Sequence, residues 1–128
     1  MNAPQTPGNW FYVSRPPYSY AIFGTSEQTP AFVMRCDRAG RVIALGRISN
    51  QTAQQPMQLL TETTTRQLTA SPRRDSVGSQ LAAELAAADS LLDAMAISKG
   101  RFAVETAGEA TLYLPSWPEV TRLIEDCR

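Results

Sequence analysis

The chain has 128 residues, and its 12 basic residues balance its 12 acidic ones. This length is typical of one domain with a single core, and the balanced charge gives no overall attraction to nucleic acid or to an anionic membrane. The sequence holds no histidine, the commonest general base and metal ligand, and no apolar run approaches the roughly 18–20 residues that span a bilayer.

The first half of the chain has the pattern of short strands. Residues 1–8 are crowded with proline and glycine, so we expect a flexible tail there, ahead of a single β-sandwich domain at residues 9–128. An aromatic-rich strand is predicted from Asn9 to Ser14, and an alternating strand from Tyr18 to Phe23.

The next four strands are predicted in two pairs. Residues 31–36 and 41–47 flank the tight turn Asp-Arg-Ala-Gly, and the turn chemistry agrees with the alternation of the flanking residues. Two further strands are predicted at 57–62 and within 63–70. An exposed loop is expected at 71–78.

The segment 79–87 has two interpretations. Its alanine-rich composition favours a helix, which could continue to Ala96. Leu81, Ala83 and Leu85 could equally form one face of a strand. Both interpretations stay open from the residues alone.

The last forty residues predict a helix, a hairpin and a second helix. Asp89 is placed to cap a short helix near 89–97, which Lys99 and Gly100 would end. Alternation on both sides of 107–109 predicts a hairpin, and Ser116 is placed to cap a C-terminal helix near 117–127. The sequence therefore predicts a mainly β fold: an antiparallel β-sandwich or partly open barrel of about 7–8 short strands, with the terminal helix closing one end.

The two cysteines, Cys36 and Cys127, lie far apart in the sequence. Two buried free thiols in a cytosolic protein would give the same pattern. The surroundings favour a disulfide, because Cys127 ends the apolar stripe of the terminal helix and Cys36 ends a strand. Without a CxxC motif or a histidine the pair forms neither a zinc site nor a redox-active site.

Four carboxylates are candidates for catalysis. Asp89 and Asp93 would share one face of a helix, and Glu105 and Glu109 flank a hairpin turn. A helix cap at Asp89 and solvent exposure of the other side chains would account for these carboxylates without catalysis. The sequence also contains no phosphate-binding loop. We therefore predict no catalytic residue, no metal and no cofactor, and keep a small carboxylate-dependent hydrolase as the alternative.

Aromatic and arginine residues of the first half form a candidate partner-binding surface: Trp10, Tyr12, Tyr18, Tyr20, Arg41 and Arg47. Tyrosine, tryptophan and arginine dominate protein–protein contacts, although the aromatic residues would serve equally as core. Arginines beside aromatic rings could also stack single-stranded nucleic acid. The balanced charge argues against that, so no nucleic-acid partner is predicted.

Five segments carry a resemblance to known proteins: W-F-Y-V-S, A-I-F-G, F-V-M-R-C-D-R-A-G-R-V-I-A-L, D-S-L-L-D-A-M-A-I-S-K-G-R-F-A-V-E and L-P-S-W-P-E-V-T-R-L-I-E-D-C-R. From Trp10 to Arg128 the chain resembles a group of small uncharacterised exported or lipoprotein-like proteins of sphingomonads and related alphaproteobacteria. The resemblance implies a precursor with a leader, which gives either a periplasmic protein or a lipoprotein that an N-terminal lipid anchor attaches to the outer membrane. The first residues, M-N-A-P-Q-T-P-G-N, lack signal-peptide features, so we expect a mature form or a cytosolic chain.

The order of elements near the C-terminus is similar, more loosely, to periplasmic proteins of the invasion-associated locus B type. In such folds a strand usually precedes the short helix, which favours the strand interpretation of 79–87. Together these observations predict a non-enzymatic exported protein that binds another macromolecule in the cell envelope, as a hydrolase inhibitor or an accessory module. A cytosolic protein with two free thiols is the other alternative, and the sequence specifies neither the partner nor the oligomeric state.

Overall fold

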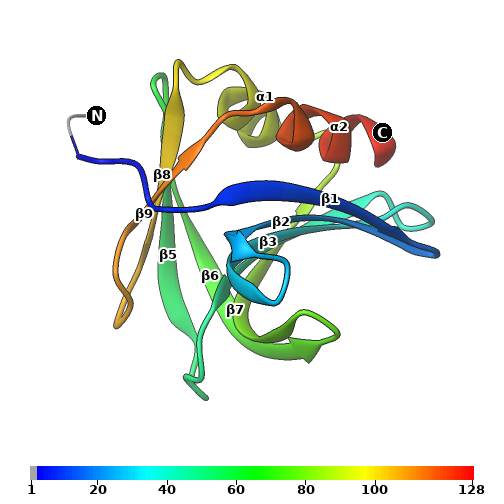
Figure 1. The fold of residues 1–128 in the computed structure, drawn as a ribbon. Coiled ribbons are helices and arrows are strands. Elements are labelled where there is room, and N and C mark those ends of the chain that lie inside the picture. Colours follow the sequence, from blue (N-terminus) through cyan, green and yellow to red (C-terminus); the bar gives the residue numbers. More distant parts are fainter. Residues whose placement is uncertain (1–2) are drawn as a thin grey trace.

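The computed structural model describes residues 3–128, which form nine strands and two short helices (Figure 1). The elements are β1 (Asn9–Arg15), β2 (Tyr18–Ser26), β3 (Thr29–Asp37), β4 (Val42–Ile48), β5 (Gln55–Leu60), β6 (Thr65–Asp75), β7 (Gly78–Ala86), α1 (Ser90–Ile97), β8 (Arg101–Thr106), β9 (Leu112–Pro115) and α2 (Pro118–Asp126). The mainly β fold and both helices are as predicted from the sequence.

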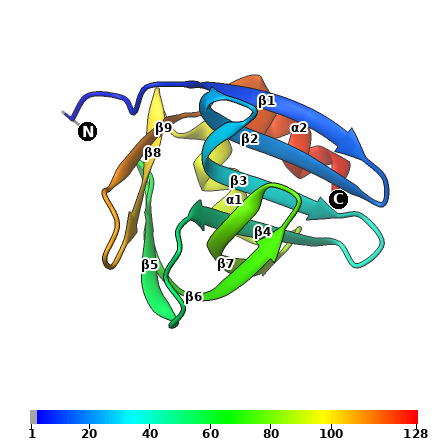
Figure 2. The ribbon, with the colours of Figure 1, turned by 60° about the horizontal axis from the view of Figure 1, so that its bottom comes forward.

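The strands form one antiparallel sheet in the order β1-β2-β3-β4-β7-β6-β5-β8-β9. The sheet curls into a half-barrel, and α1 and α2 lie together at one end of it (Figures 1 and 2). Of the two predicted architectures, the partly open barrel is therefore the one that forms. Its concave side holds a single large core, in which the bulkiest side chains include Phe23, Phe32 and Phe102.

The segment 79–87 is strand, because β7 lies between β4 and β6 in the middle of the sheet. Leu81, Ala83 and Leu85 face the core, as period-two alternation requires, and this burial outweighs the helix propensity of the alanines. The predicted exposed loop at 71–78 was wrong, because β6 continues to Asp75 and pairs there with β7.

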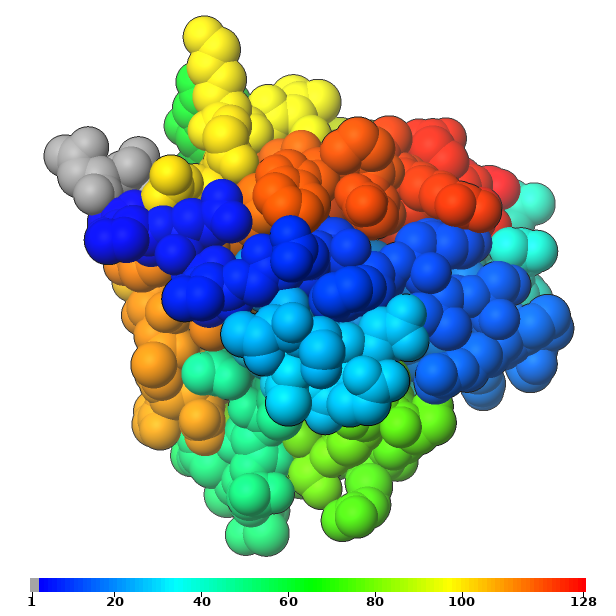
Figure 3. Space-filling view, in the orientation of Figure 1, coloured from blue at the N-terminus to red at the C-terminus, as the bar shows by residue number. Residues whose placement is uncertain are grey.

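The two edges of the sheet are covered. The backbone N–H of Thr6 donates to the Tyr113 carbonyl at 2.9 Å, and the Tyr113 N–H donates to the Thr6 hydroxyl at 2.8 Å, so the segment before β1 pairs with β9. The other edge, β1, lies against α2 (Figure 3). Flexibility of residues 1–8 stays a prediction, and residues 1–2 lie outside the described part of the chain.

The C-terminal helix is attached to the sheet by a disulfide. Cys36 of β3 and Cys127, which caps the end of α2, are bonded with their Cα atoms 5.6 Å apart. The predicted cap of α2 was wrong: Trp117 is the N-cap residue, and the Ser116 hydroxyl donates instead to the Met95 carbonyl at 2.8 Å. Within residues 3–128, neither helix is long and apolar enough to cross a membrane.

Candidate binding surface on the outer face of the sheet

Trp10 is a core residue. Its ring packs edge-on against Phe23 and Phe32, at centroid distances of 5.3 and 6.4 Å, and its indole N–H donates to the Pro115 carbonyl at 2.7 Å. Only 4% of its surface is exposed. A partner could reach this side chain only by opening the barrel.

Tyr12 lies on the same face of β1 and attaches that strand to α2. Its hydroxyl donates to the Asp126 carboxylate, and the guanidinium carbon of Arg122 lies 3.7 Å from its ring centroid. Burial, together with the hydrogen bond to Asp126, raises the pKa of Tyr12. These contacts give Tyr12 a structural role, which is to hold α2 against β1.

Arg41 and Arg47 lie at opposite ends of β4. Arg41 is exposed in the β3–β4 turn, where its φ is +51°. The Arg47 guanidinium donates to the carbonyls of Ile48, at 3.1 Å, and Ala110, at 3.2 Å. Burial lowers the pKa of Arg47, and the nearby Glu109 carboxylate opposes that shift.

Of the six residues in the predicted surface, Tyr18 and Tyr20 are brought together on the outer, convex face of the sheet. Their rings meet edge-on at 6.4 Å, because both side chains point away from the core, which Ala21 and Phe23 fill from the same strand. Three arginines from outside the predicted surface join them. We name the five residues the outer-face cluster: Arg15, Tyr18, Tyr20, Arg35 and Arg73.

The arginines of the cluster stack on its tyrosines. The guanidinium carbon of Arg35 lies 4.6 Å from the ring centroid of Tyr18, and that of Arg15 lies 5.9 Å from the centroid of Tyr20. Such cation–π contacts hold the guanidinium plane in a fixed place without using its N–H donors. Arg35 and Tyr20 face each other across β2 and β3 in the sheet register.

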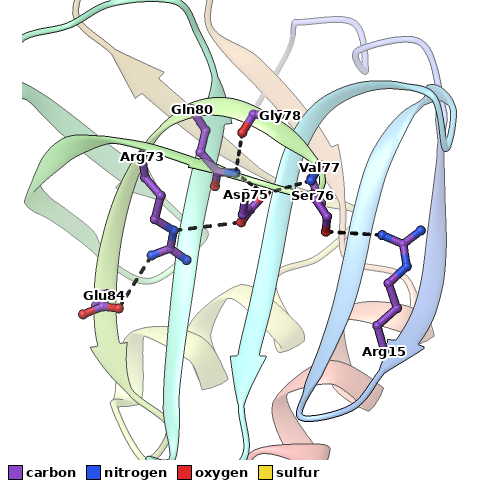
Figure 4. Close-up of polar contacts among 8 residues, drawn as sticks. All are labelled: Arg15, Arg73, Asp75, Ser76, Val77, Gly78, Gln80 and Glu84. Atoms are coloured by element: carbon purple, nitrogen blue, oxygen red, sulfur yellow. Dashed lines mark hydrogen bonds and ion pairs between the residues drawn. The ribbon is translucent and has the colours of Figure 1, made fainter.

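The tip of the β6–β7 hairpin folds over this face (Figures 2 and 4). Val77 packs on a small second core of Tyr20, Ile22 and Val33. Next to it, Ser76 accepts a hydrogen bond of 3.4 Å from Arg15. The hairpin thereby connects β7 to β1 across the outside of three strands.

Gln80 and Asp75 hold the shape of the hairpin. The Asp75 carboxylate accepts hydrogen bonds from the Val77 N–H, at 2.8 Å, and from the Gln80 amide, at 3.1 Å. The Gln80 side chain extends from β7 across β4 and passes over Gly46. A Cβ atom at Gly46 would be 1.9 Å from the Gln80 amide oxygen. A glycine is therefore required at that position for the side chain to cross the strand.

Arg73 is held by two long ion pairs. Its Nε is 3.9 Å from Asp75, and its Nη1 is 3.6 Å from Glu84 (Figure 4). Its Nε and Nη2 are buried and have no hydrogen-bond acceptor within residues 3–128. Burial, and next the charge of Arg35, lower the pKa of Arg73.

Arg35 is a half-buried cation without a counter-ion. Among the described residues it takes part in no ion pair and no hydrogen bond, and its Nε is buried. A buried donor without an acceptor costs about 1–3 kcal/mol, and more when the group is charged. Arg35 is thus a polar group whose contacts within the chain leave its hydrogen-bonding capacity unused.

Several hollows border the cluster, and those beside Arg15 and Arg73 that are lined by Glu27 and Glu84, respectively, measure about 290 and 320 Å³. Another, of about 220 Å³, lies beside Tyr18 and is lined by Ser14, Pro16, Pro17, Tyr18 and Arg38. The largest of these hollows, of about 450 Å³, lies on the other flank of the hairpin, between Arg73 and the loop that follows β4. The walls of this largest hollow contain hydroxyl, amide and guanidinium groups, and no carboxylate or aromatic ring.

The carboxylates considered for catalysis have structural contacts. Asp89 accepts from the Leu91 N–H and pairs with Arg66, each at 2.8 Å, and Asp93 pairs with Arg128 at 2.7 Å. These arginines are the main cause of the lowered pKa of each aspartate. A general acid at neutral pH needs the opposite shift.

The other two carboxylates, Glu105 and Glu109, have different neighbours. Glu109 accepts hydrogen bonds from Ser49, at 2.6 Å, and Gln51, at 2.9 Å, which lower its pKa. Glu105 is exposed on β8 beside a hollow of about 250 Å³. No group of three metal-ligating side chains occurs within residues 3–128.

Comparison with known proteins finds no family model, no curated protein and no solved structure that matches this chain.

Proposed function

We propose that the protein is a non-enzymatic binding module of the cell envelope, which contacts a partner macromolecule through the outer-face cluster. The observation that carries the proposal is Arg35, which is stacked on Tyr18 and has no acceptor for its N–H groups within residues 3–128. Arginine and tyrosine beside a small hollow are typical of the residues that dominate binding energy at interfaces.

A rigid support favours this role, because a surface that is already ordered loses little conformational entropy when it binds. The cluster lies on β1, β2, β3 and the β6–β7 hairpin, and the hydrogen bonds of Ser76 and Asp75 fix the hairpin. The disulfide between Cys36 and Cys127 fixes β3 to α2 on the opposite side of the sheet.

The disulfide also supports the compartment. Structural disulfides form and persist in oxidising compartments and are rare in the cytosol of mesophiles. The bond between Cys36 and Cys127 is consistent with an extracytoplasmic location. The periplasm, or attachment to the outer membrane, is the location that we propose.

Site-specific photocrosslinking in intact cells of the native host tests the proposal. Tyr18 is replaced by p-benzoylphenylalanine, which keeps an aromatic ring at the cluster. Tyr113, a partly buried tyrosine on β9 at the other end of the sheet order, is the matched control position. We expect one discrete adduct from position 18, no such adduct from position 113, and loss of the adduct when Arg35→Gln is added.

Two results would contradict the proposal. Equal adduct patterns from positions 18 and 113 would mean that crosslinking reports random collisions. A position-18 adduct that Arg35→Gln leaves unchanged would mean that Arg35 takes no part in recognition. Thermal unfolding of each variant shows whether the substitution has left the fold intact.

A further inference from the structure

We infer that Arg35 receives a carboxylate, presented by an acidic segment of a partner protein that lies across the outer face between the β1–β2 turn and the β6–β7 hairpin. The inference deepens the proposed function and rests on it, since it specifies the chemistry of the partner at the same cluster. Its basis is the donor geometry of Arg35, the distribution of charge around it and the composition of the adjacent hollow.

The donor geometry suits a carboxylate. A guanidinium presents five N–H donors in one plane, and two parallel donors match the two oxygens of a carboxylate. The guanidinium carbon of Arg35 lies 4.6 Å from the ring centroid of Tyr18, and this contact uses none of the N–H donors. No carboxylate within residues 3–128 comes within 4.0 Å of its nitrogens, so a carboxylate partner of Arg35 would come from another molecule.

The surrounding charge is positive. Tyr18 of β2 pairs with Arg15 of β1 and with Asp37 of β3, and Asp37 pairs in turn with Val42 of β4. The β1–β2 and β3–β4 turns therefore lie side by side, which brings Arg38 and Arg41 to the same end of the sheet as Arg15 (Figure 2). Because the whole chain has no net charge, this is a local excess. A local excess of positive charge attracts and orients an acidic partner.

The acidic residues at this end already have partners within the chain. Asp37 accepts a hydrogen bond of 3.3 Å from the Gly40 N–H, and Asp126 binds Tyr12 and lies 3.9 Å from Arg38. Burial is the main cause of the lowered pKa of Arg73, and repulsion from the nearby charge of Arg35 adds to it. A carboxylate bound at Arg35 would relieve that repulsion.

The hollow beside Tyr18 favours a peptide over a phosphate group. Pro16, Pro17 and the Tyr18 ring give it apolar walls, and its volume of about 220 Å³ suits one or two side chains next to the acidic one. Asp75 and Glu84 lie on the same face, so a dianionic phosphate would meet more repulsion than a single carboxylate. An acidic peptide combines the carboxylate with the apolar contact.

Titration of the ¹⁵N-labelled protein with hexaglutamate at low salt tests the inference, with the arginine Nε–H resonances as the readout. Arg41→Gln is the matched control, because Arg41 belongs to the same hairpin, is exposed and takes part in no ion pair among the described residues. We expect Arg35 to shift, Arg35→Gln to weaken binding about tenfold or more, and Arg41→Gln to weaken it less than about twofold. Arg35→Lys should restore only part of the affinity, since lysine lacks the planar pair of donors.

Three results would overturn the inference. Equal weakening by Arg35→Gln and Arg41→Gln would show general charge attraction, and an unchanged Arg35 resonance at millimolar hexaglutamate would show that the site takes no carboxylate. A stronger response of Arg35 to inorganic phosphate than to hexaglutamate would assign the site to a phosphate source. None of these results would contradict the proposed function itself. The crosslink at position 18 tests that function separately, because it depends on contact and not on the charge of the partner.

Discussion

At the scale of single residues, Asp89 shows how one side chain begins a helix and joins it to the sheet. One carboxylate oxygen accepts from the Leu91 N–H and the other pairs with Arg66 of β6, both at 2.8 Å. We predict that Asp89→Ala lowers the free energy of unfolding by about 1–2 kcal/mol, the usual cost of losing a helix cap. Urea denaturation at neutral pH measures the change.

Asp89→Asn separates the cap from the charge, because asparagine keeps a capping oxygen and loses the ion pair with Arg66. We expect it to cost less than Asp89→Ala at neutral pH, since an exposed ion pair contributes little. Equal losses for the two variants would show that the ion pair, and not the cap, stabilises the start of α1.

The lowered carboxylate pKa values predict an acid limit to stability. The arginine hydrogen bonds of Asp89 and Asp93 lower their pKa, as the hydrogen bonds from Ser49 and Gln51 lower that of Glu109. A carboxylate with a lowered pKa stabilises the fold above its unfolded-state pKa, about 4, and loses that effect as the pH falls through the folded-state value. We therefore expect the free energy of unfolding to fall below about pH 4, and to fall less in Asp89→Asn than in the wild type.

At the scale of elements, the β6–β7 hairpin depends on a glycine of β4. A Cβ atom at Gly46 would meet the Gln80 amide oxygen at 1.9 Å and Val33 Cγ1 at 3.0 Å. We predict that Gly46→Ala destabilises the protein by about 1–3 kcal/mol, as overpacking generally does. Gln80→Ala in the same chain should recover part of that loss, and a double-mutant cycle measures the coupling.

Additive effects of Gly46→Ala and Gln80→Ala would contradict this account of the hairpin. A matched control is Gly100→Ala, because no atom lies within 4 Å of a Cβ built there, although its φ of +79° adds its own backbone strain. That variant should therefore show no coupling to Gln80→Ala, whatever its separate cost.

Elements were predictable from the sequence where two local signals agreed. The hairpin of β3 and β4 combined turn residues with alternating side chains, and both strands lie where this pattern predicts. At β7 the signals conflicted, because alanine favours helix locally whereas the position between β4 and β6 is decided by pairing with strands from elsewhere in the chain. The prediction of a loop at 71–78 was wrong for the same reason. Residues 71–75 extend β6 only because β7 is a strand with which they can pair.

The candidate site was only partly predictable. Tyr18 and Tyr20 were selected as aromatic residues, and alternation places both on one face of β2. Arg35 meets Tyr18 through the β2–β3 register, and Arg73 arrives through a hairpin that folds back over the sheet. No local pattern in the sequence contains these contacts, because each depends on how distant strands are ordered in the sheet.

At the scale of the whole molecule, the disulfide joins the C-terminal helix to a central part of the fold. Cys36 and Cys127 are 91 residues apart, so their bond closes most of the chain into one loop. The chain-entropy model assigns about 4–5 kcal/mol to a closure of this length, and residual structure in the unfolded state reduces the measured value. We predict that Cys36→Ala/Cys127→Ala loses about 2–4 kcal/mol and retains the sheet.

The measurement is guanidinium denaturation of the wild type, the double variant and the reduced wild type. Tyr12 and the apolar stripe of Val120, Leu123 and Ile124 still hold α2 against the sheet when the bond is absent, so the loss should appear in the midpoint without a second transition. A separate early transition would mean that α2 detaches on its own and that the bond is its main attachment.

Thiol alkylation in the native host tests the compartment. A labelled Cys36 or Cys127 in freshly lysed cells would place the protein in a reducing compartment and remove the support for an envelope partner.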